Sequence, residues 1–183
     1  MGFKYGVIGA GRQGIAAAYD IASRGNADEV VVADIDEQAA RRGAARVNRL
    51  FGRDVAQGVR GDASKAESLA TALAGARALV SSVHYAVNPA LTRLAIRLTA
   101  SMCDLGGNTR IALEQRVHDA DAKAAGVSIV PDCGMGPGLN ITLAADGRVT
   151  RGATPVELVD PKAVVDEFRR RGFTIGEKIV TGG

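Results

Sequence analysis

The chain contains few of the residues that build several common kinds of site. It has no tryptophan, only 4% aromatic residues and only two cysteines, Cys103 and Cys133, in 183 residues. Two cysteines exclude a disulfide framework and a four-cysteine zinc site. No apolar run is long enough to span a membrane, and the N-terminus lacks the pattern of a signal peptide. We therefore expect a cytoplasmic protein with no membrane partner.

An excess of charge of one sign is also lacking, since 23 Lys and Arg residues face 20 Asp and Glu residues. Five arginines nevertheless gather around one predicted helix: Arg41, Arg42, Arg46, Arg49 and Arg53. A cluster of this kind can bind nucleic acid or can form a solvated helix face. The near balance of charge favours the solvated face, so we predict no nucleic-acid partner.

Glycine, in contrast, is abundant, and its most informative positions lie near the N-terminus. The apolar run at residues 5–8 leads into Gly9-Ala10-Gly11-Arg12-Gln13-Gly14, which has the G-x-G-x-x-G spacing, and a helical pattern follows at once. Asp34 ends the next apolar run, twenty residues after Gly14. A strand, a glycine turn, a helix and an acidic residue at this distance together form a dinucleotide-binding fingerprint.

Each part of the fingerprint has a physical role. Gly9 permits the tight turn, Gly11 lets the backbone approach a pyrophosphate, and Gly14 lets the helix pack closely on the strand. The N-terminus of the helix then presents unpaired N–H groups to the phosphates. Asp34 would accept hydrogen bonds from the adenosine ribose. The alternative is a glycine-rich turn that binds nothing, and the complete context favours the binding interpretation.

Apolar runs alternate with helical patterns along the chain. This alternation predicts an α/β fold with a doubly wound parallel sheet of six strands in the order 3-2-1-4-5-6. The ligand of such a sheet binds where the strand order reverses, beside the first strand. The strands are expected at residues 5–8, 30–33, 55–59, 78–82, 102–105 and 127–130.

Capping residues and apolar stripes mark the helices. We expect Asp36 to cap the second helix, and Asn88, which precedes Pro89, to cap the helix after the fourth strand. The helix after the fifth strand is expected to bury four apolar residues along one face: Leu113, Val117, Ala120 and Ala124. Towards the C-terminus, helices are predicted near residues 141–145 and 160–171, and an edge strand at 173–180.

Three short runs resemble the saccharopine dehydrogenase family, and within it the lysine 6-dehydrogenase-like branch. They are Asp-Leu-Gly-Gly-Asn at 104–108, Val-Pro-Asp-Cys-Gly-Met-Gly-Pro-Gly at 130–138, and Ser-Ser-Val-His-Tyr-Ala-Val-Asn at 81–88, where the family more often has proline at the position of His84. The resemblance implies an NAD(P)-dependent oxidoreductase that acts on an amine carbon of lysine, saccharopine or a related amino acid.

The resemblance also implies where a dinucleotide would lie. The glycine turn would hold the pyrophosphate, the segment after strand four would follow the middle of the cofactor, and the segment after strand five would lie near the nicotinamide. The expected cofactor-binding residues are Gly9, Gly11, Arg12, Gln13, Gly14, Asp34, Ile35, Ser81, Ser82, Val83, His84, Asp104, Leu105, Gly106 and Gly107.

The chain departs from the family after residue 143. In the family a substrate domain follows this point, whereas residues 147–173 already look like the C-terminal segment that returns to the nucleotide domain. We therefore expect a single domain over residues 1–183, with a core at 1–140 and a return segment at 147–183, from which the substrate domain has been deleted. The catalytic residues and the substrate stay unknown, and a homodimer through newly exposed apolar surface is expected.

Three functions are compatible with this organisation. The first is a domain that binds NAD with little or no turnover, the second a small active dehydrogenase, and the third an NAD-sensing module. The carboxylate of Asp34 would repel a 2′-phosphate, and Ile35, Asp36 and Glu37 follow it rather than an arginine, so NAD is favoured over NADP.

Two further groups of residues could take part in chemistry. His84 is a candidate general base, although an exposed loop histidine is the simpler interpretation. Asp104 and Asp132 end neighbouring strands beside Cys103 and Cys133. They could perform acid–base chemistry or bind a metal, but we favour carboxylates that cap turns and thiols that fill space, with no metal.

Overall fold

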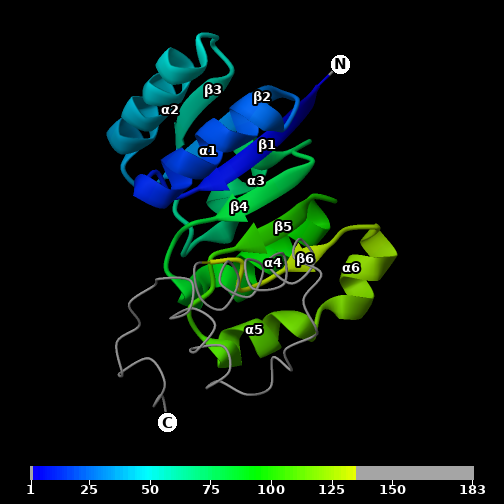
Figure 1. Cartoon of the computed structure of the whole chain (residues 1–183). Coiled ribbons are helices and arrows are strands. Elements are labelled where there is room, and N and C mark those ends of the chain that lie inside the picture. The colour runs from blue at the N-terminus through cyan, green and yellow to red at the C-terminus, as the bar shows by residue number, and fades with distance from the viewer. Residues whose placement is uncertain (1, 135–183) are drawn as a thin grey trace, which may run out of the picture. The chain divides into compact units, whose positions relative to one another are not determined.

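The computed structural model describes residues 2–134 and contains a parallel sheet of six strands in the order β3-β2-β1-β4-β5-β6 (Figure 1). The predicted α/β fold and strand order are confirmed. In β1 and β2 the register pairs Ile8 with Ala33, so the two carboxyl ends lie together. The strands are β1 Phe3–Ile8, β2 Ala27–Asp34, β3 Ala56–Arg60, β4 Ala78–Ser81, β5 Ser101–Asp104 and β6 Ile129–Val130.

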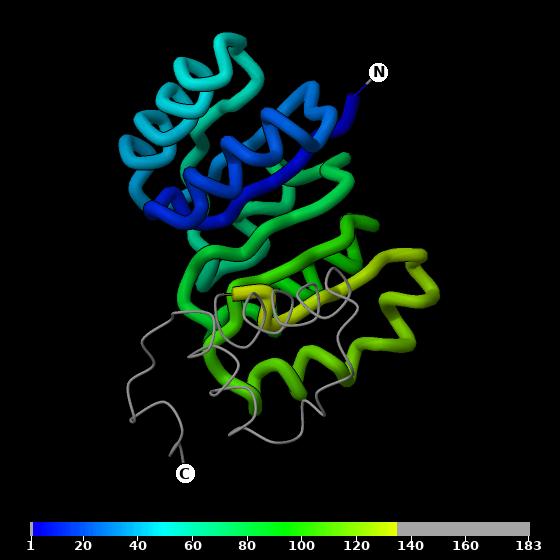
Figure 2. The backbone as a smooth tube through the Cα atoms, viewed as in Figure 1, coloured from blue at the N-terminus to red at the C-terminus, as the bar shows by residue number. Residues whose placement is uncertain are grey.

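Helices connect the strands, and the path of the chain can be followed in Figure 2. Two single-turn 3₁₀ helices, η1 Ala66–Leu69 and η2 Tyr85–Val87, precede α3 and α4. The α-helices are α1 Arg12–Arg24, α2 Glu37–Phe51, α3 Ala70–Leu73, α4 Asn88–Arg97, α5 Thr109–Arg116 and α6 Asp119–Ala125. No helix of the described residues is long and apolar enough to cross a membrane.

The sheet is covered on both faces, which explains why β2 is a continuous apolar run. Val30 and Val32 belong to one buried cluster with residues of α1 and α2, whereas Val31 and Ala33 belong to a second cluster with residues of α3 and α4. Neighbouring side chains in a strand point to opposite faces, so both faces of β2 are apolar. The connections from β1 to β2 and from β2 to β3 are right-handed crossovers, so α1 and α2 lie on the same face of the sheet. The turn after β1 and the turn after β2 are therefore neighbours.

The helix predicted after β5 differs from the expectation. It is divided into α5 and α6, and Leu113 and Val117 are 54% and 73% exposed; Ala120 and Ala124 are also exposed. The buried face of α5 consists of Ile111 and Gln115 instead. A polar glutamine takes the inward position because its amide has buried hydrogen-bond partners, and an apolar pattern cannot reveal such a position.

Capping was predicted correctly in one helix and wrongly in another. Asp36 caps α2 by accepting hydrogen bonds from the amides of Gln38 and Ala39 at 2.9 and 3.1 Å. Asn88 is not a cap, because η2 continues directly into α4 and the Asn88 side chain is buried. The C-terminal elements, the return segment and the deleted domain predicted after residue 140 lie outside the described residues.

Candidate functional site

The glycine turn after β1 has the close packing that its sequence predicts. Gly9 has φ of +103°, a conformation that favours glycine. A Cβ atom on Gly14 would collide with the carbonyl oxygen of Gly9, so no larger residue fits where α1 meets the turn. Gly9 and Gly14 thereby bring the first turn of α1 against the carboxyl end of β1.

Gly11 differs from its neighbours because nothing lies within 4 Å of the position of its Cβ atom. Gly11 is the N-cap residue of α1, and because it has no side chain it leaves the first N–H groups of the helix uncapped. These amides and the positive end of the helix dipole suit an anion. The space over Gly11 is therefore open where the fingerprint needs room for a pyrophosphate, and the exposed side chains of Arg12 and Gln13 flank it.

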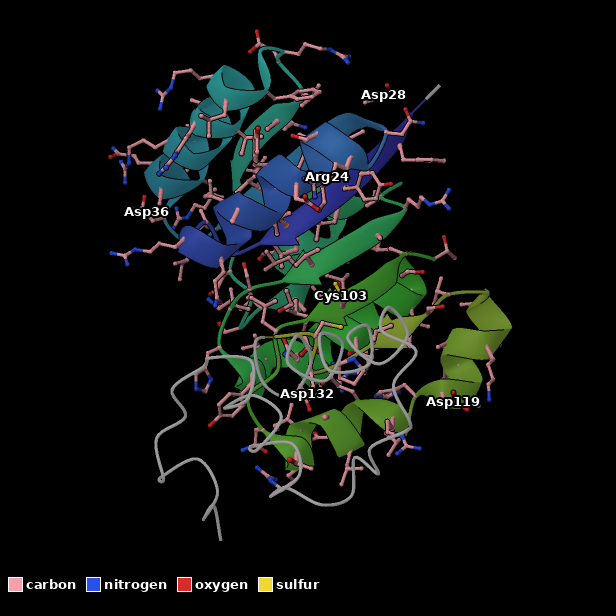
Figure 3. The ribbon with its side chains drawn as sticks, viewed as in Figure 1. Arg24, Asp28, Asp36, Cys103, Asp119 and Asp132 are labelled. Atoms are coloured by element: carbon pink, nitrogen blue, oxygen red, sulfur yellow. The ribbon has the colours of Figure 1, made fainter. Side chains whose placement is uncertain are left out.

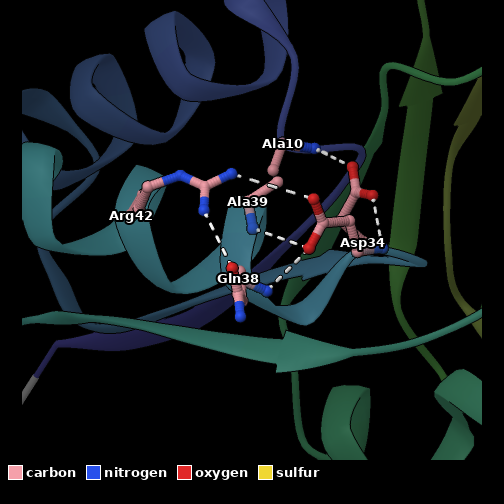
Figure 4. Close-up of polar contacts among 6 residues, drawn as sticks. Ala10, Asp34, Gln38, Ala39 and Arg42 are labelled. Atoms are coloured by element: carbon pink, nitrogen blue, oxygen red, sulfur yellow. Dashed lines mark hydrogen bonds and ion pairs between the residues drawn. The ribbon is translucent and has the colours of Figure 1, made fainter.

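Asp34 ends β2 directly beside this turn. Its Oδ2 atom accepts a hydrogen bond of 2.7 Å from the Ala10 amide, and its Oδ1 atom accepts one of 2.9 Å from the Asp36 amide (Figure 4). Each carboxylate oxygen retains a further lone pair, so Asp34 can still accept hydrogen bonds from a ligand. Ile35, which follows it, is 64% exposed. The turn after β1 and the acid at the end of β2 are thus joined by a hydrogen bond at one edge of the sheet.

The two serines at the end of β4, Ser81 in the strand and Ser82 after it, have different contacts. The Ser82 hydroxyl is placed to donate to two carbonyl oxygens, that of Ile8 at 2.9 Å and that of Gly9 at 3.1 Å. Ser82 therefore fastens the glycine turn to the loop after β4. Ser81 is buried and donates to Asn88 Oδ1 at 2.7 Å, so its hydroxyl points into the fold rather than toward the edge of the sheet.

The loop after β4 reaches from the glycine turn to the loop after β5. Val83 lies against Gly9, and the ring of Tyr85 lies against Gly107. His84 is exposed; its Nδ1 atom accepts a hydrogen bond of 3.3 Å from the Ala86 amide, and its ring stacks on Tyr85 with centroids 4.1 Å apart. The orientation of the imidazole is therefore held by two contacts, although the residue is exposed.

Asp104 is a buried centre of hydrogen bonding at the end of β5. Its Oδ1 atom accepts from the amides of Gly106 at 2.8 Å and Asp132 at 3.2 Å, and its Oδ2 atom accepts from Gln115 Nε2 at 2.8 Å. The Gln115 amide also donates to Thr92 Oγ1. Because its carboxylate already serves three donors, Asp104 shapes the loops around it, which agrees with the turn-capping interpretation.

The loop after β5 is held in an unusual conformation by these bonds. Gly106 and Gly107 have φ of +67° and +120°, and Leu105 donates its amide to the Ser81 carbonyl at 3.3 Å. Asp132, itself at φ of +59°, accepts a hydrogen bond from the Gly107 amide at 3.2 Å. The loops after β4, β5 and β6 are thus joined into one platform at the carboxyl edge.

The two thiols lie beside this platform, and both are poor nucleophiles at neutral pH. Burial, together with the neighbouring Cys133 and Asp104, raises the pKa of Cys103 to about 11. Burial also raises the pKa of the Cys133 thiol, which donates to the Val130 carbonyl at 3.3 Å. Among residues 2–134 no three side chains of His, Cys, Asp or Glu gather closely enough to hold a metal ion. Figure 3 shows Cys103 and Asp132 in this part of the molecule.

Asp62 is a neighbour of the site that the sequence analysis missed. The Gly61 amide donates to the Asp34 carbonyl at 2.9 Å, so the half-buried Asp62 follows at the same edge of the sheet. Hydrogen bonds from Ser64 lower the pKa of the Asp62 carboxyl. The sequence could have indicated Asp62 through the predicted strand order. In the order 3-2-1 the carboxyl end of strand three lies beside that of strand two, where Asp34 is.

The fold and the glycine turn together define the class of the protein: it is an NAD(P)-binding domain of the Rossmann type found in dehydrogenases. Residues 5–130 match the model of the family described as the saccharopine dehydrogenase NADP binding domain. The chain belongs to this family, as the resemblance of its glycine-rich runs implied.

Solved structures share the fold at low sequence identity. Apo saccharopine dehydrogenase (L-Glu forming) from Saccharomyces cerevisiae has a TM-score of 0.62 and 18% identity over 93% of this chain and 32% of that chain. Quinate dehydrogenase from Corynebacterium glutamicum in complex with NAD has a TM-score of 0.53 and 20% identity over 93% and 56% of the two chains. Mycobacterium tuberculosis shikimate dehydrogenase has a TM-score of 0.55 and 19% identity over 89% and 56%. The chain therefore spans between about a third and slightly more than half of the length of these proteins.

Proposed function

We propose that the chain binds NAD(H) across the carboxyl edge of its sheet, with the pyrophosphate over Gly11 and the adenosine ribose at Asp34. The observation that carries the proposal is the combination of open space over Gly11 with the Asp34 carboxylate on the adjoining turn. An empty position above an uncapped helix N-terminus suits a phosphate, and a carboxylate beside it suits ribose hydroxyls.

Each predicted residue has a distinct part in this proposal. Gly9 and Gly14 shape the turn, while the first amides of α1 and the side chains of Arg12 and Gln13 face the phosphates. Ile35 would cover the adenosine. The remaining residues would lie along the middle of the dinucleotide or shape the nicotinamide end: Ser81, Ser82, Val83, His84, Asp104, Leu105, Gly106 and Gly107.

We propose NAD rather than NADP as the cofactor. Asp34 would stabilise free ribose hydroxyls by charge-assisted hydrogen bonds, each contributing about 1.5–3 kcal/mol, and would repel a 2′-phosphate. The quinate dehydrogenase that shares the fold was solved in complex with NAD. The family is described as NADP-binding, so direct titration with both nucleotides is needed.

We further propose that the chain belongs to an amino-acid oxidoreductase of the lysine 6-dehydrogenase-like branch and that it supports little or no turnover. Hydride transfer needs a substrate held about 3–3.5 Å from the nicotinamide. The few residues between Leu143 and Asp146 leave no room for the domain that holds the substrate in the family. The alternatives are a small active dehydrogenase and an NAD-sensing module.

The test is a titration with NADH and NADPH by calorimetry or cofactor fluorescence, followed by an assay with lysine or saccharopine and NAD. We expect NADH to bind more tightly than NADPH and no sustained formation of NADH in the assay. Tighter binding of NADPH would contradict the role of Asp34, and steady turnover would favour the active enzyme. The predicted homodimer is tested separately by sedimentation, where a monomer at all concentrations would contradict it.

A further inference from the structure

We propose that Asp36 is a second determinant of cofactor choice: its carboxylate disfavours NADP by adding a negative charge beside the ribose end of the site and by pairing with Arg42. This inference rests on the proposed binding of NAD(H) at Asp34. It assigns Asp36 a role in nucleotide selection in addition to its role as the cap of α2.

Asp36 lies next to the carboxylate proposed to hold the ribose. Its amide donates to Asp34 Oδ1 at 2.9 Å, and α2 begins at the following residue, Glu37. A 2′-phosphate replaces a hydroxyl that Asp34 would hold, so it would have to lie close to both Asp34 and Asp36. Two carboxylates beside a phosphate dianion oppose its binding more strongly than Asp34 alone.

The Asp36 carboxylate also occupies the groups that a phosphate would use. Oδ1 accepts from the amides of Gln38 and Ala39 at 2.9 and 3.1 Å, and Oδ2 lies 3.7 Å from a guanidinium nitrogen of Arg42 (Figure 4). Helix N-terminal amides and arginine are characteristic phosphate ligands. In this chain the amides of α2 and the Arg42 guanidinium contact the Asp36 carboxylate instead.

Arg42 is the cation paired with Asp36, so it loses this partner if that charge is removed. It lines a hollow of about 690 Å³ between α1 and α2 that begins at Ala10 and Gly11. Its other contact is a long one, 3.4 Å from Nη1 to Gln38 Oε1. Arg41 is less available, because it is paired with Glu37 at 2.6 Å. The Asp36–Arg42 pair is well exposed, so its own contribution to stability is small.

The experiment separates the charge of Asp36 from its capping role. Asparagine is as good an N-cap as aspartate, so Asp36→Asn retains the oxygen that accepts from Gln38 and Ala39 and removes only the charge. Dissociation constants for NADH and NADPH are measured by calorimetry for the wild type, Asp36→Asn and the double variant Asp36→Asn/Arg42→Gln. Asp119→Asn, which removes a carboxylate from an exposed pair on α6, is the matched control.

We expect Asp36→Asn to tighten NADPH binding about fivefold to tenfold and to change NADH binding less than about twofold. The gain should be smaller in the double variant, which keeps the relief of repulsion but lacks Arg42, and Asp119→Asn should change neither constant. An unchanged ratio of NADPH to NADH affinity in Asp36→Asn, with NADH still bound, would overturn this inference alone. A gain of the same size in the double variant would exclude the role of Arg42. Failure of the wild type to bind NADH would overturn the proposed function and this inference with it.

Discussion

The Asp34 carboxylate accepts a hydrogen bond of 2.7 Å from the Ala10 amide, which ties the end of β2 to the glycine turn after β1. Asp34 therefore stabilises the turn and also presents its remaining lone pairs at the same edge. The residue proposed to select the ribose and the backbone proposed to hold the pyrophosphate are one hydrogen bond apart.

Replacing Asp34 should weaken NADH binding substantially. We expect Asp34→Ala to raise the dissociation constant for NADH about tenfold to 100-fold, because charge-assisted hydrogen bonds contribute about 1.5–3 kcal/mol. Calorimetric titration measures the change. Asp28→Ala is a suitable control, since Asp28 lies in the same strand near its opposite end, where it accepts from the Gly2 amide. An equal loss in both variants would argue against the proposed contact.

The glycines of the fingerprint should respond differently to alanine. Gly14→Ala should lower the free energy of unfolding by about 1–3 kcal/mol, because the new Cβ atom collides with the Gly9 carbonyl oxygen. Gly11→Ala meets no protein atom within 4 Å, so it should lower stability less than Gly14→Ala while NADH binding is lost. Urea unfolding and NADH titration of both variants test this contrast. Normal NADH binding by Gly11→Ala would contradict the placement of the pyrophosphate.

Asp104 should be essential for stability. Asp104→Ala removes the acceptor of three donors, the amides of Gly106 and Asp132 and the side chain of Gln115. Each buried donor left without an acceptor destabilises the folded state. We therefore expect the free energy of unfolding, measured with urea, to fall by about 3 kcal/mol or more. Asp119→Ala, which disrupts only an exposed pair with Lys123, should cost less than about 0.5 kcal/mol. Comparable stability of the two variants would show that the buried network contributes little.

The stability of the protein should fall at alkaline pH through Cys103. Burial raises the pKa of this thiol from 9.0 to about 11, so between these values the folded state retains a proton that the unfolded state has lost. The stabilisation is complete below pH 9 and declines as the pH rises towards 11. Urea unfolding of the wild type and Cys103→Ala at pH 8 and 10.5 should show the stability difference shrinking at the higher pH. A difference that stays constant would indicate that the thiol titrates normally.

Much of the fold could be predicted from the sequence because its signals are local. Apolar runs separated by helical patterns predicted six strands and their order, and the position of Asp36 before a helical stripe predicted its cap. The glycine turn and Asp34 were found from spacing alone. The stripe on α5 was predicted wrongly, since Gln115 is buried by bonds to Thr92 and Asp104, which are distant in sequence.

The sequence by itself determined the class of fold and the position of the glycine turn, because these depend on residue type and spacing over short distances. The family was indicated by the resemblance of its glycine-rich runs, and the family model confirms it. Only the tertiary structure decided what the polar residues at the sheet edge do. It directed Ser81 to Asn88, Ser82 to the glycine turn and Asp104 to a buried network. The physical reason is that hydrogen bonds are short and directional, so their partners depend on how separate strands and loops come together in space.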